Sequence, residues 1–262
     1  MTSSLPRMRQ TIPELKETLD RLYLEVNKPD FIPFDPVQFP RRYKSVCDKE
    51  AAAFLSATIA WGRRDMILKS AEKMFSLLGP SPYEFVMEGE CKKFPENSRG
   101  ANIHRTFFES DLRYFCKGLK ACYAKFGSLE KLFASTADVW EGISLFRETM
   151  AGGNKGLYSK HISNPAAGSA CKRLHLALRW LVRREGPVDL GLWKSIAPSS
   201  LFIPLDLHVG RTARHLGLLQ RKANDKKAVI SLTEKLREFC PDDPVRYDFA
   251  LFGYSVNNNF SV

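Results

Sequence analysis

The segment Pro204–Gly217, with the sequence PLDLHVGRTARHLG, contains a full set of signals for a short helix. Pro204 fixes its own φ angle and favours an extended conformation in the residue before it. Asp206 is a residue type preferred at a helix N-cap, because its carboxylate can accept a hydrogen bond from a free backbone N–H of the first turn. Gly217 is the type that commonly ends a helix. The segment therefore predicts a helix over Leu207–Leu216, capped by Asp206.

Helical periodicity extends well beyond this segment. Apolar residues recur at intervals of three and four along most of the chain, and the alternation typical of strands is rare. The other periodic segments predict helices over Thr11–Val26, Asp48–Trp61, Arg64–Leu78, Phe107–Phe126, Leu129–Phe133, Ser169–Arg184, Leu190–Ile196, Lys226–Phe239 and Pro244–Phe252. Gly152–Gly168 contains four glycines and is expected to be a flexible joint. We predict an all-α fold, formed by residues 1–262 as one unit of two helical lobes with a cleft between them.

Composition narrows the class of protein. A hydrophobic content of 44% with 26% charged residues is typical of a globular protein. No apolar run approaches the roughly 20 residues needed to cross a bilayer, so no membrane partner is expected. Met1–Arg7 lacks the apolar stretch of a secretory signal, which favours the cytoplasm. The six cysteines show no metal-ligand spacing, so we expect no metal site, iron–sulfur cluster or other cofactor.

Positive charge is concentrated in one part of the chain. The net charge is +11, and residues 170–227 hold twelve Lys or Arg against four Asp or Glu. Such a region is typical of proteins that bind a polyanion, usually nucleic acid, and we expect double-stranded DNA as the partner. The alternative is a basic surface that serves only solubility.

Three cations fall on one face of the predicted helix Ser169–Arg184. Arg179 and Arg183 lie seven and eleven residues after Lys172, so both fall within about 20° of it on the helical wheel. This face is opposite the apolar stripe. The pattern predicts a row of cations along a nucleic-acid groove, or, as the alternative, a solvated basic face.

A carboxylate facing a lysine suits chemistry at the C1′ atom of a nucleotide. The carboxylate can stabilise the positive charge that develops as a base departs, as in glycosidases. A lysine amine can attack C1′ and form a Schiff base. Such an enzyme must also flip the nucleotide out of the duplex, which requires a cleft and a wedge side chain.

The segment Pro204–Val209, followed by Arg211 and by Arg214–Leu218, resembles the stretch that carries the essential aspartate in helix-hairpin-helix DNA glycosylases. That superfamily includes endonuclease III and the 8-oxoguanine glycosylases. Phe54–Thr58 is similar to an early helix of those enzymes. Roughly residues 10–255 resemble an uncharacterised bacterial conserved-domain family assigned to this superfamily. The segments that carry this second resemblance are Lys172–Leu174, Leu178–Arg183, Asp189–Trp193 and Asp243–Phe249.

The resemblance implies a two-lobed glycosylase fold and a DNA N-glycosylase, with AP lyase activity if a lysine attacks C1′. It implies that Asp206 is the catalytic aspartate and that Lys172, 34 residues upstream, is the candidate lyase lysine. Three features depart from the superfamily, and one of them is the absence of the cysteine cluster of endonuclease III. Asn164–Ser169 replaces the glycine-rich hairpin that normally offers N–H groups to a DNA phosphate, so this contact is left to a helix start at Ser169. Thr58 replaces the glutamine that inserts into the duplex.

The remaining candidate site residues are assigned by type. Thr58 and Trp61 are candidates for the base pocket or wedge, with a core position as the alternative for Trp61. Phe249, Phe252 and Tyr254 are assigned to the core, with the wall of a base pocket as their alternative. The candidate DNA-binding residues are Arg63, Arg64, Ser169, Arg173, Arg179, Arg183, His208, Arg211 and Arg214.

These residues lead to two hypotheses of different classes. The first is a repair-type DNA glycosylase that acts on a flipped, damaged base. The second is a non-catalytic nucleic-acid-binding protein that retains the glycosylase fold.

Overall fold

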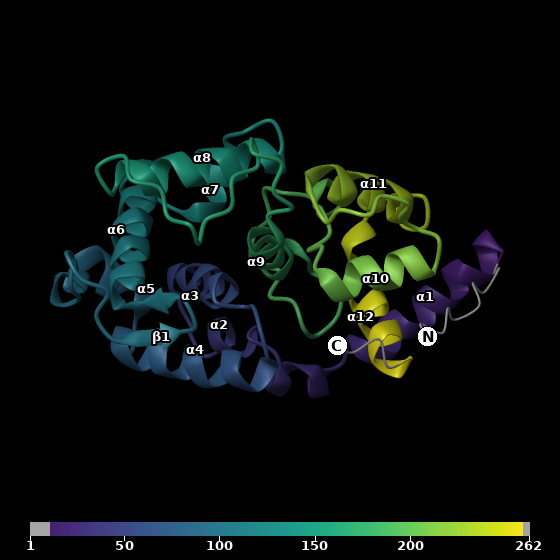
Figure 1. Cartoon of the computed structure of the whole chain (residues 1–262), viewed down its shortest axis with the longest axis horizontal. Coiled ribbons are helices and arrows are strands. Elements are labelled where there is room, and N and C mark those ends of the chain that lie inside the picture. The colour runs from purple at the N-terminus through teal and green to yellow at the C-terminus, as the bar shows by residue number, and fades with distance from the viewer. Residues whose placement is uncertain (1–10, 259–262) are drawn as a thin grey trace.

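A computed structural model describes residues 11–258, and this part of the chain is mostly helical (Figure 1). Met1–Arg7, on which the expected absence of a secretory signal depends, lies outside the described residues. The α-helices are α1 (Ile12–Val26), α2 (Gln38–Arg41), α3 (Val46–Thr58), α4 (Arg64–Leu78), α5 (Pro82–Glu88), α6 (Glu109–Phe126), α7 (Leu129–Ala134), α8 (Val139–Gly152), α9 (Lys172–Val182), α10 (Leu207–His215), α11 (Lys226–Arg237) and α12 (Tyr247–Asn257). The 3-10 helices are η1 (Pro29–Phe34), η2 (Glu90–Lys93), η3 (Pro198–Ser200) and η4 (Pro244–Arg246). The strands β1 (Asn102–His104) and β2 (Phe107–Phe108) form an antiparallel hairpin. The all-α class is confirmed.

The helices lie in two groups, with α9 between them (Figure 1). One group contains α2 to α8, and the other contains α10, α11 and α12 together with α1. The first and last helices, α1 and α12, pack against each other, so both ends of the described chain belong to the second group. Within the described residues, every helix is too short or too polar to span a bilayer.

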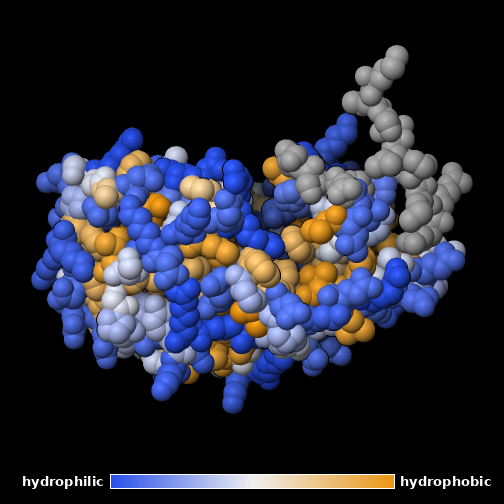
Figure 2. Space-filling view, turned by 90° about the horizontal axis from the view of Figure 1, so that it is seen from below, coloured by the Kyte–Doolittle hydropathy of each residue, from blue (hydrophilic) through white to orange (hydrophobic). Residues whose placement is uncertain are grey.

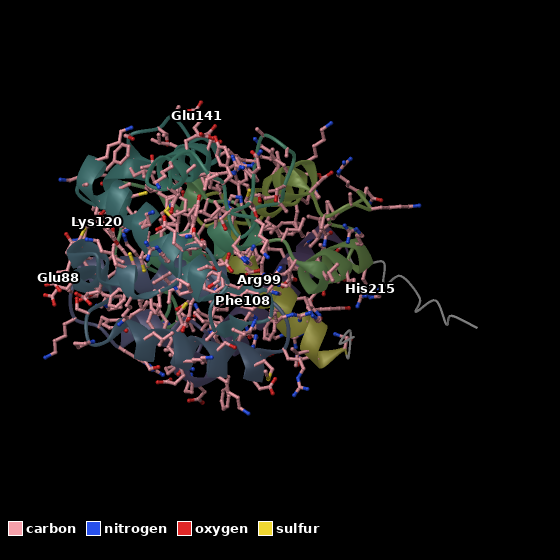
Figure 3. The ribbon with its side chains drawn as sticks, turned by 60° about the vertical axis from the view of Figure 1, so that its left-hand side comes forward. Glu88, Arg99, Phe108, Lys120, Glu141 and His215 are labelled. Carbon is pink, nitrogen blue, oxygen red and sulfur yellow. The ribbon has the colours of Figure 1, made fainter. Side chains whose placement is uncertain are left out.

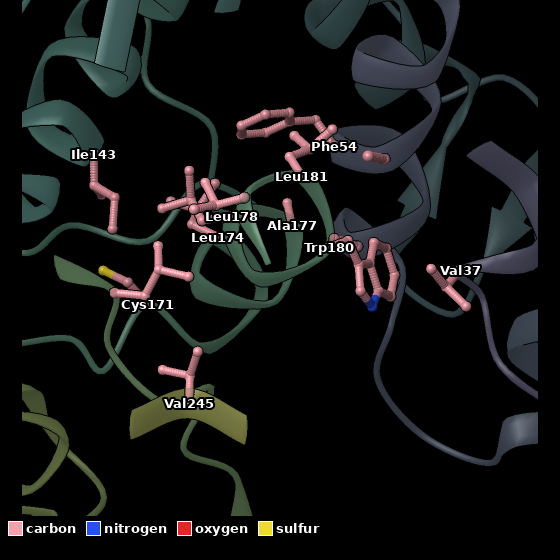
Figure 4. Packing of buried hydrophobic residues seen from close by; sticks show 14 of the residues in the cluster. Val37, Phe54, Ile143, Cys171, Leu174, Ala177, Leu178, Trp180, Leu181 and Val245 are labelled. Carbon is pink, nitrogen blue, oxygen red and sulfur yellow. The ribbon is translucent and has the colours of Figure 1, made fainter. Parts of the chain in front are cut away.

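The core surrounds α9 rather than lying on one side of it. Trp180 points toward Val37, whereas Leu181 on the next position points toward Phe54 of α3 (Figure 4). Leu178 lies on the side of Ile143 from α8 (Figure 4). Because other elements cover α9 on several sides, its polar face has little access to solvent. On the outside of the molecule, Figure 2 shows a mainly hydrophilic surface in which apolar residues gather in patches nearer the middle of the face.

The predicted basic face of α9 is wrong for Arg179 and Arg183. The Arg183 side chain is fully buried, and its guanidinium donates hydrogen bonds to Asp189 and Asp243. Arg179 is 4% exposed and donates to Asp189 and Asp248. A helical wheel cannot show that carboxylates from the loop after α9 (Asp189) and from the segment around η4 (Asp243 and Asp248) cover the face. Both arginines are therefore structural residues of a buried ion-pair network.

The predicted helix boundaries agree with the structure where local signals determine them and differ where long-range contacts do. The predicted helix over Leu190–Ile196 is wrong, because the N–H groups of Leu190 and Trp193 donate to carbonyls near the end of α9. The helix predicted from Ser169 begins at Lys172, since Ser169 instead pairs with Asp225 as an isolated β-bridge. The helix capped by Asp206 is confirmed: Oδ1 of Asp206 accepts a hydrogen bond from the N–H of Val209 at 2.9 Å.

Candidate functional site

A cavity of about 970 Å³ opens where the first turns of α9 and α10 meet α12 and the turn after α3. Six Lys and Arg residues of the described chain line its wall. Five of them, which we call the rim cations, are Arg63, Arg64, Arg105, Lys172 and Arg173, and the sixth, Arg179, is paired with Asp189 and Asp248. The carboxylates in the wall are Asp35, Asp206 and Asp248, and the aromatic side chains are Phe31, Trp61, Phe249 and Phe252. The cavity is therefore both charged and aromatic.

Lys172 and Asp206 face each other in this wall. Nζ of Lys172 lies 3.9 Å from Oδ2 of Asp206 and donates a hydrogen bond to the carbonyl of Ala60 at 3.1 Å. The side chains are 27% and 35% exposed, so solvent and a ligand can reach both. Each residue is held by a helix start, since Lys172 is the first residue of α9 and Asp206 is the N-cap of α10. The cap uses Oδ1 and leaves Oδ2 toward the lysine.

A chain of hydrogen bonds fixes the backbone at Asp206. The side-chain amide of Asn224 donates to the Asp206 carbonyl at 2.9 Å. Arg214 in turn donates to Oδ1 of Asn224 and to the carbonyls of Arg221 and Ala223. Arg214, predicted to bind DNA, is therefore committed to these acceptors and serves to position the Asp206 segment.

Trp61 forms a second wall together with Arg173. The guanidinium of Arg173 lies 4.8 Å from the Trp61 ring and donates to the carbonyl of Thr58. Burial lowers the pKa of Arg173 to about 10, so it remains charged at neutral pH. Behind Trp61, the rings of His104 and His161 lie at 4.6 and 5.7 Å. The Thr58 side chain is buried and its hydroxyl donates to the carbonyl of Phe54, so the prediction of Thr58 as a wedge is wrong.

The far wall consists of α12 and η1. Phe249 and Phe252 each lie edge-on to Phe31, at 5.6 and 5.8 Å. The pKa of Asp248 is raised to about 6, mainly by burial and also by Asp206, while Arg179 and Lys172 oppose the rise. Burial also raises the pKa of Asp35. Neither carboxylate was predicted as a site residue, because neither carries a local signal in the sequence. Phe249 and Phe252 line the cavity, which is the alternative given for them above.

Most of the other predicted DNA-binding residues line the cavity: Arg63, Arg64, Ser169 and His208. Arg63 is exposed and paired with Asp65 at 2.8 Å, and Arg64 lies 4.8 Å over the Phe252 ring. Arg211 is exposed on α10 outside the lining. Across residues 11–258, no three His, Cys, Asp or Glu side chains are grouped to hold a metal ion.

Comparison with protein families gives a match over most of the chain. Residues 35–257 match the family described as Protein of unknown function (DUF2400), and this range contains Lys172, Asp206 and nearly every residue of the cavity wall. Comparison with curated proteins and with solved structures gave no match. The match covers most of the 262 residues, and the chain therefore belongs to the DUF2400 family.

Proposed function

We propose that this protein binds double-stranded DNA and removes a damaged base from a nucleotide flipped into the cavity, as a DNA N-glycosylase that can continue as an AP lyase. One observation carries the proposal: an amine and a carboxylate lie 3.9 Å apart in the solvent-accessible wall of a cavity. The same pair was expected from the sequence on the resemblance to helix-hairpin-helix glycosylases. The glycosylase fold itself is part of this proposal.

The surroundings of the pair suit a nucleotide. Aromatic side chains offer faces against which a flipped base can stack. The rim cations offer positive charge to the phosphates on either side of that nucleotide. A net charge of +11 favours association with DNA over the whole surface.

The residues then have defined roles in the reaction. The bond between C1′ and the base nitrogen breaks, the base leaves with the electron pair, and the carboxylate of Asp206 stabilises the positive charge on the sugar. Nζ of Lys172 gives one proton to the departing base and attacks C1′ with the freed electron pair. A second proton moves from this nitrogen to the ring oxygen as the C1′–O4′ bond breaks, which leaves a Schiff base.

Trapping with borohydride tests the lyase step, because only a Schiff base is reduced to a stable covalent complex. Duplexes carrying a panel of damaged bases and an abasic site are incubated with the wild type, Lys172→Gln and Lys155→Gln. Lys155 is exposed and lies outside the cavity lining, so it controls for the loss of one surface charge. We expect trapping by the wild type and Lys155→Gln, and none by Lys172→Gln.

Release of free base must be measured on the same duplexes, because a glycosylase can act without the lysine. Base release without trapping would remove Lys172 from the mechanism and keep Asp206. Salt-dependent DNA binding with neither activity would favour the non-catalytic nucleic-acid binder. The absence of DNA binding would contradict both.

A further inference from the structure

Arg105 occupies an unusual backbone conformation at the edge of the cavity. It lies in the turn between β1 and β2 with φ = +51°, in the left-handed region that residues with a Cβ seldom adopt. Within residues 11–258, three residues other than glycine have positive φ: Arg105, Lys155 and Cys171. Two of the three, Arg105 and Cys171, line the cavity. Backbone strain of this kind concentrates at functional sites.

Hydrogen bonds and a cation–π contact hold the hairpin that carries Arg105 on both sides of its turn. The His104 ring makes hydrogen bonds to the Trp61 carbonyl at 2.8 Å and to the Ser70 hydroxyl at 2.9 Å. The side chain of Asn102 donates to the Arg105 carbonyl at 2.6 Å. The guanidinium of Arg99, which precedes β1, lies 5.3 Å over the ring of Phe108 on β2, and the two labelled residues lie side by side in Figure 3. The turn is therefore held in place against the Trp61 wall.

The guanidinium of Arg105 lies against the backbone of Gly62. A Cβ placed on Gly62 would be 2.6 Å from Nη1 of Arg105, so the close approach depends on the glycine, whose φ is +94°. Arg105 is exposed, and within the described part of the chain its side chain makes no ion pair or hydrogen bond. Five N–H donors are thus presented at the cavity mouth without an acceptor.

We infer that Arg105 binds a phosphodiester of the strand whose nucleotide enters the cavity, and so positions that strand; this inference rests on the proposed function. The ligand is an anion, because Arg105 is one of five rim cations and no carboxylate of residues 11–258 pairs with it. A planar guanidinium matches the two free oxygens of a phosphodiester with two parallel hydrogen bonds. Rigid attachment of the hairpin reduces the entropy lost when this contact forms.

The test compares Arg105→Gly with Lys155→Gly. Each substitution removes one exposed cation and relieves one positive φ, so each should leave the melting temperature unchanged or raise it by ~2 °C or more. Binding to a fluorescent duplex containing a tetrahydrofuran abasic analogue is measured from 50 to 300 mM KCl. Arg105→Gly should weaken binding about tenfold at low salt and reduce the slope of log K against log salt by about one. Lys155→Gly should change neither.

Arg105→Lys keeps the charge but not the planar fork, so it should bind between the wild type and Arg105→Gly. If Arg105→Gly binds with the affinity and salt slope of Lys155→Gly, the inference is overturned, whatever base release shows. If Arg105→Gly loses binding as expected while the wild type releases no base, the phosphate contact is supported and the glycosylase is not. If the wild type does not bind the duplex, both are overturned.

Discussion

Replacing Asp189 with Asn tests whether Arg179 and Arg183 are structural residues. The Asp189 side chain is fully buried, with Oδ1 3.2 Å from Nε of Arg179 and Oδ2 hydrogen-bonded to Nη1 of Arg183. Asn has the same shape but no charge, and its amide nitrogen cannot accept from a guanidinium. Among the described residues, Arg179 then keeps Asp248 as its carboxylate partner and Arg183 keeps Asp243.

Removing one partner of a buried ion pair typically costs about 3–5 kcal/mol, because the other charge stays buried without compensation. In a protein of this size, roughly 2–4 °C of melting temperature corresponds to each kcal/mol, so Asp189→Asn should melt about 10 °C below the wild type. The control is Asp65→Asn, which breaks an exposed pair with Arg63 and should cost less than about 1 kcal/mol.

Urea unfolding followed by circular dichroism measures both variants. If Asp189→Asn unfolds within about 1 kcal/mol of Asp65→Asn, the network does not hold the two arginines, and their assignment to DNA binding becomes tenable again. The loss of stability in Asp189→Asn should lower the urea concentration at the unfolding midpoint while the m-value stays constant, since the surface exposed on unfolding is nearly unchanged.

Two further predictions concern stability. Burial lowers the pKa of His175 to about 3 in the folded chain. As the pH falls below about 6.5, the imidazole is therefore protonated in the unfolded chain but stays neutral in the folded one. The free energy of unfolding should fall by about 2 kcal/mol between pH 7 and pH 5. His175→Phe should remove this part of the acid sensitivity, and an unchanged pH profile of urea unfolding would contradict it. Gly118→Ala should destabilise by about 1–3 kcal/mol, because the new Cβ would lie 2.6 Å from Sδ of Met150. Gly152→Ala in α8 meets nothing within 4 Å and should be neutral or stabilising; equal thermal shifts for both glycine variants would refute the packing argument.

The helix at the candidate site could be predicted from the sequence because its signals are local. Asp206 and Gly217 lie at the two ends of the helical stretch, and capping depends on neighbouring backbone groups. The fold class followed in the same way from periodicity. By contrast, the surroundings of Arg179 and Arg183 depend on residues up to 160 positions away, which no pattern within α9 can reveal.

The residues of the candidate site differ in the same way in how far the sequence predicts them. Lys172 and Asp206 could be nominated from their types and the family resemblance, but their 3.9 Å separation depends on how α9 and α10 pack. Arg105 could not be predicted as a site residue, because neither its positive φ nor its close approach to Gly62 can be inferred from the sequence. Asp248 was missed because its pKa depends on burial in the folded chain.

The most direct measurement of the central claim is single-turnover release of base by Asp206→Asn against Asp225→Asn. Both aspartates are helix N-caps, and Asp225 accepts from the N–H of Ala228 at 3.0 Å in α11, so the two variants make the same substitution at the same type of cap. On the damaged duplex that the wild type processes, Asp206→Asn should release base at least about 100-fold more slowly while binding DNA with similar affinity. Asp225→Asn should remain active. Base release by Asp206→Asn at the rate of Asp225→Asn would contradict the role of the Lys172–Asp206 pair.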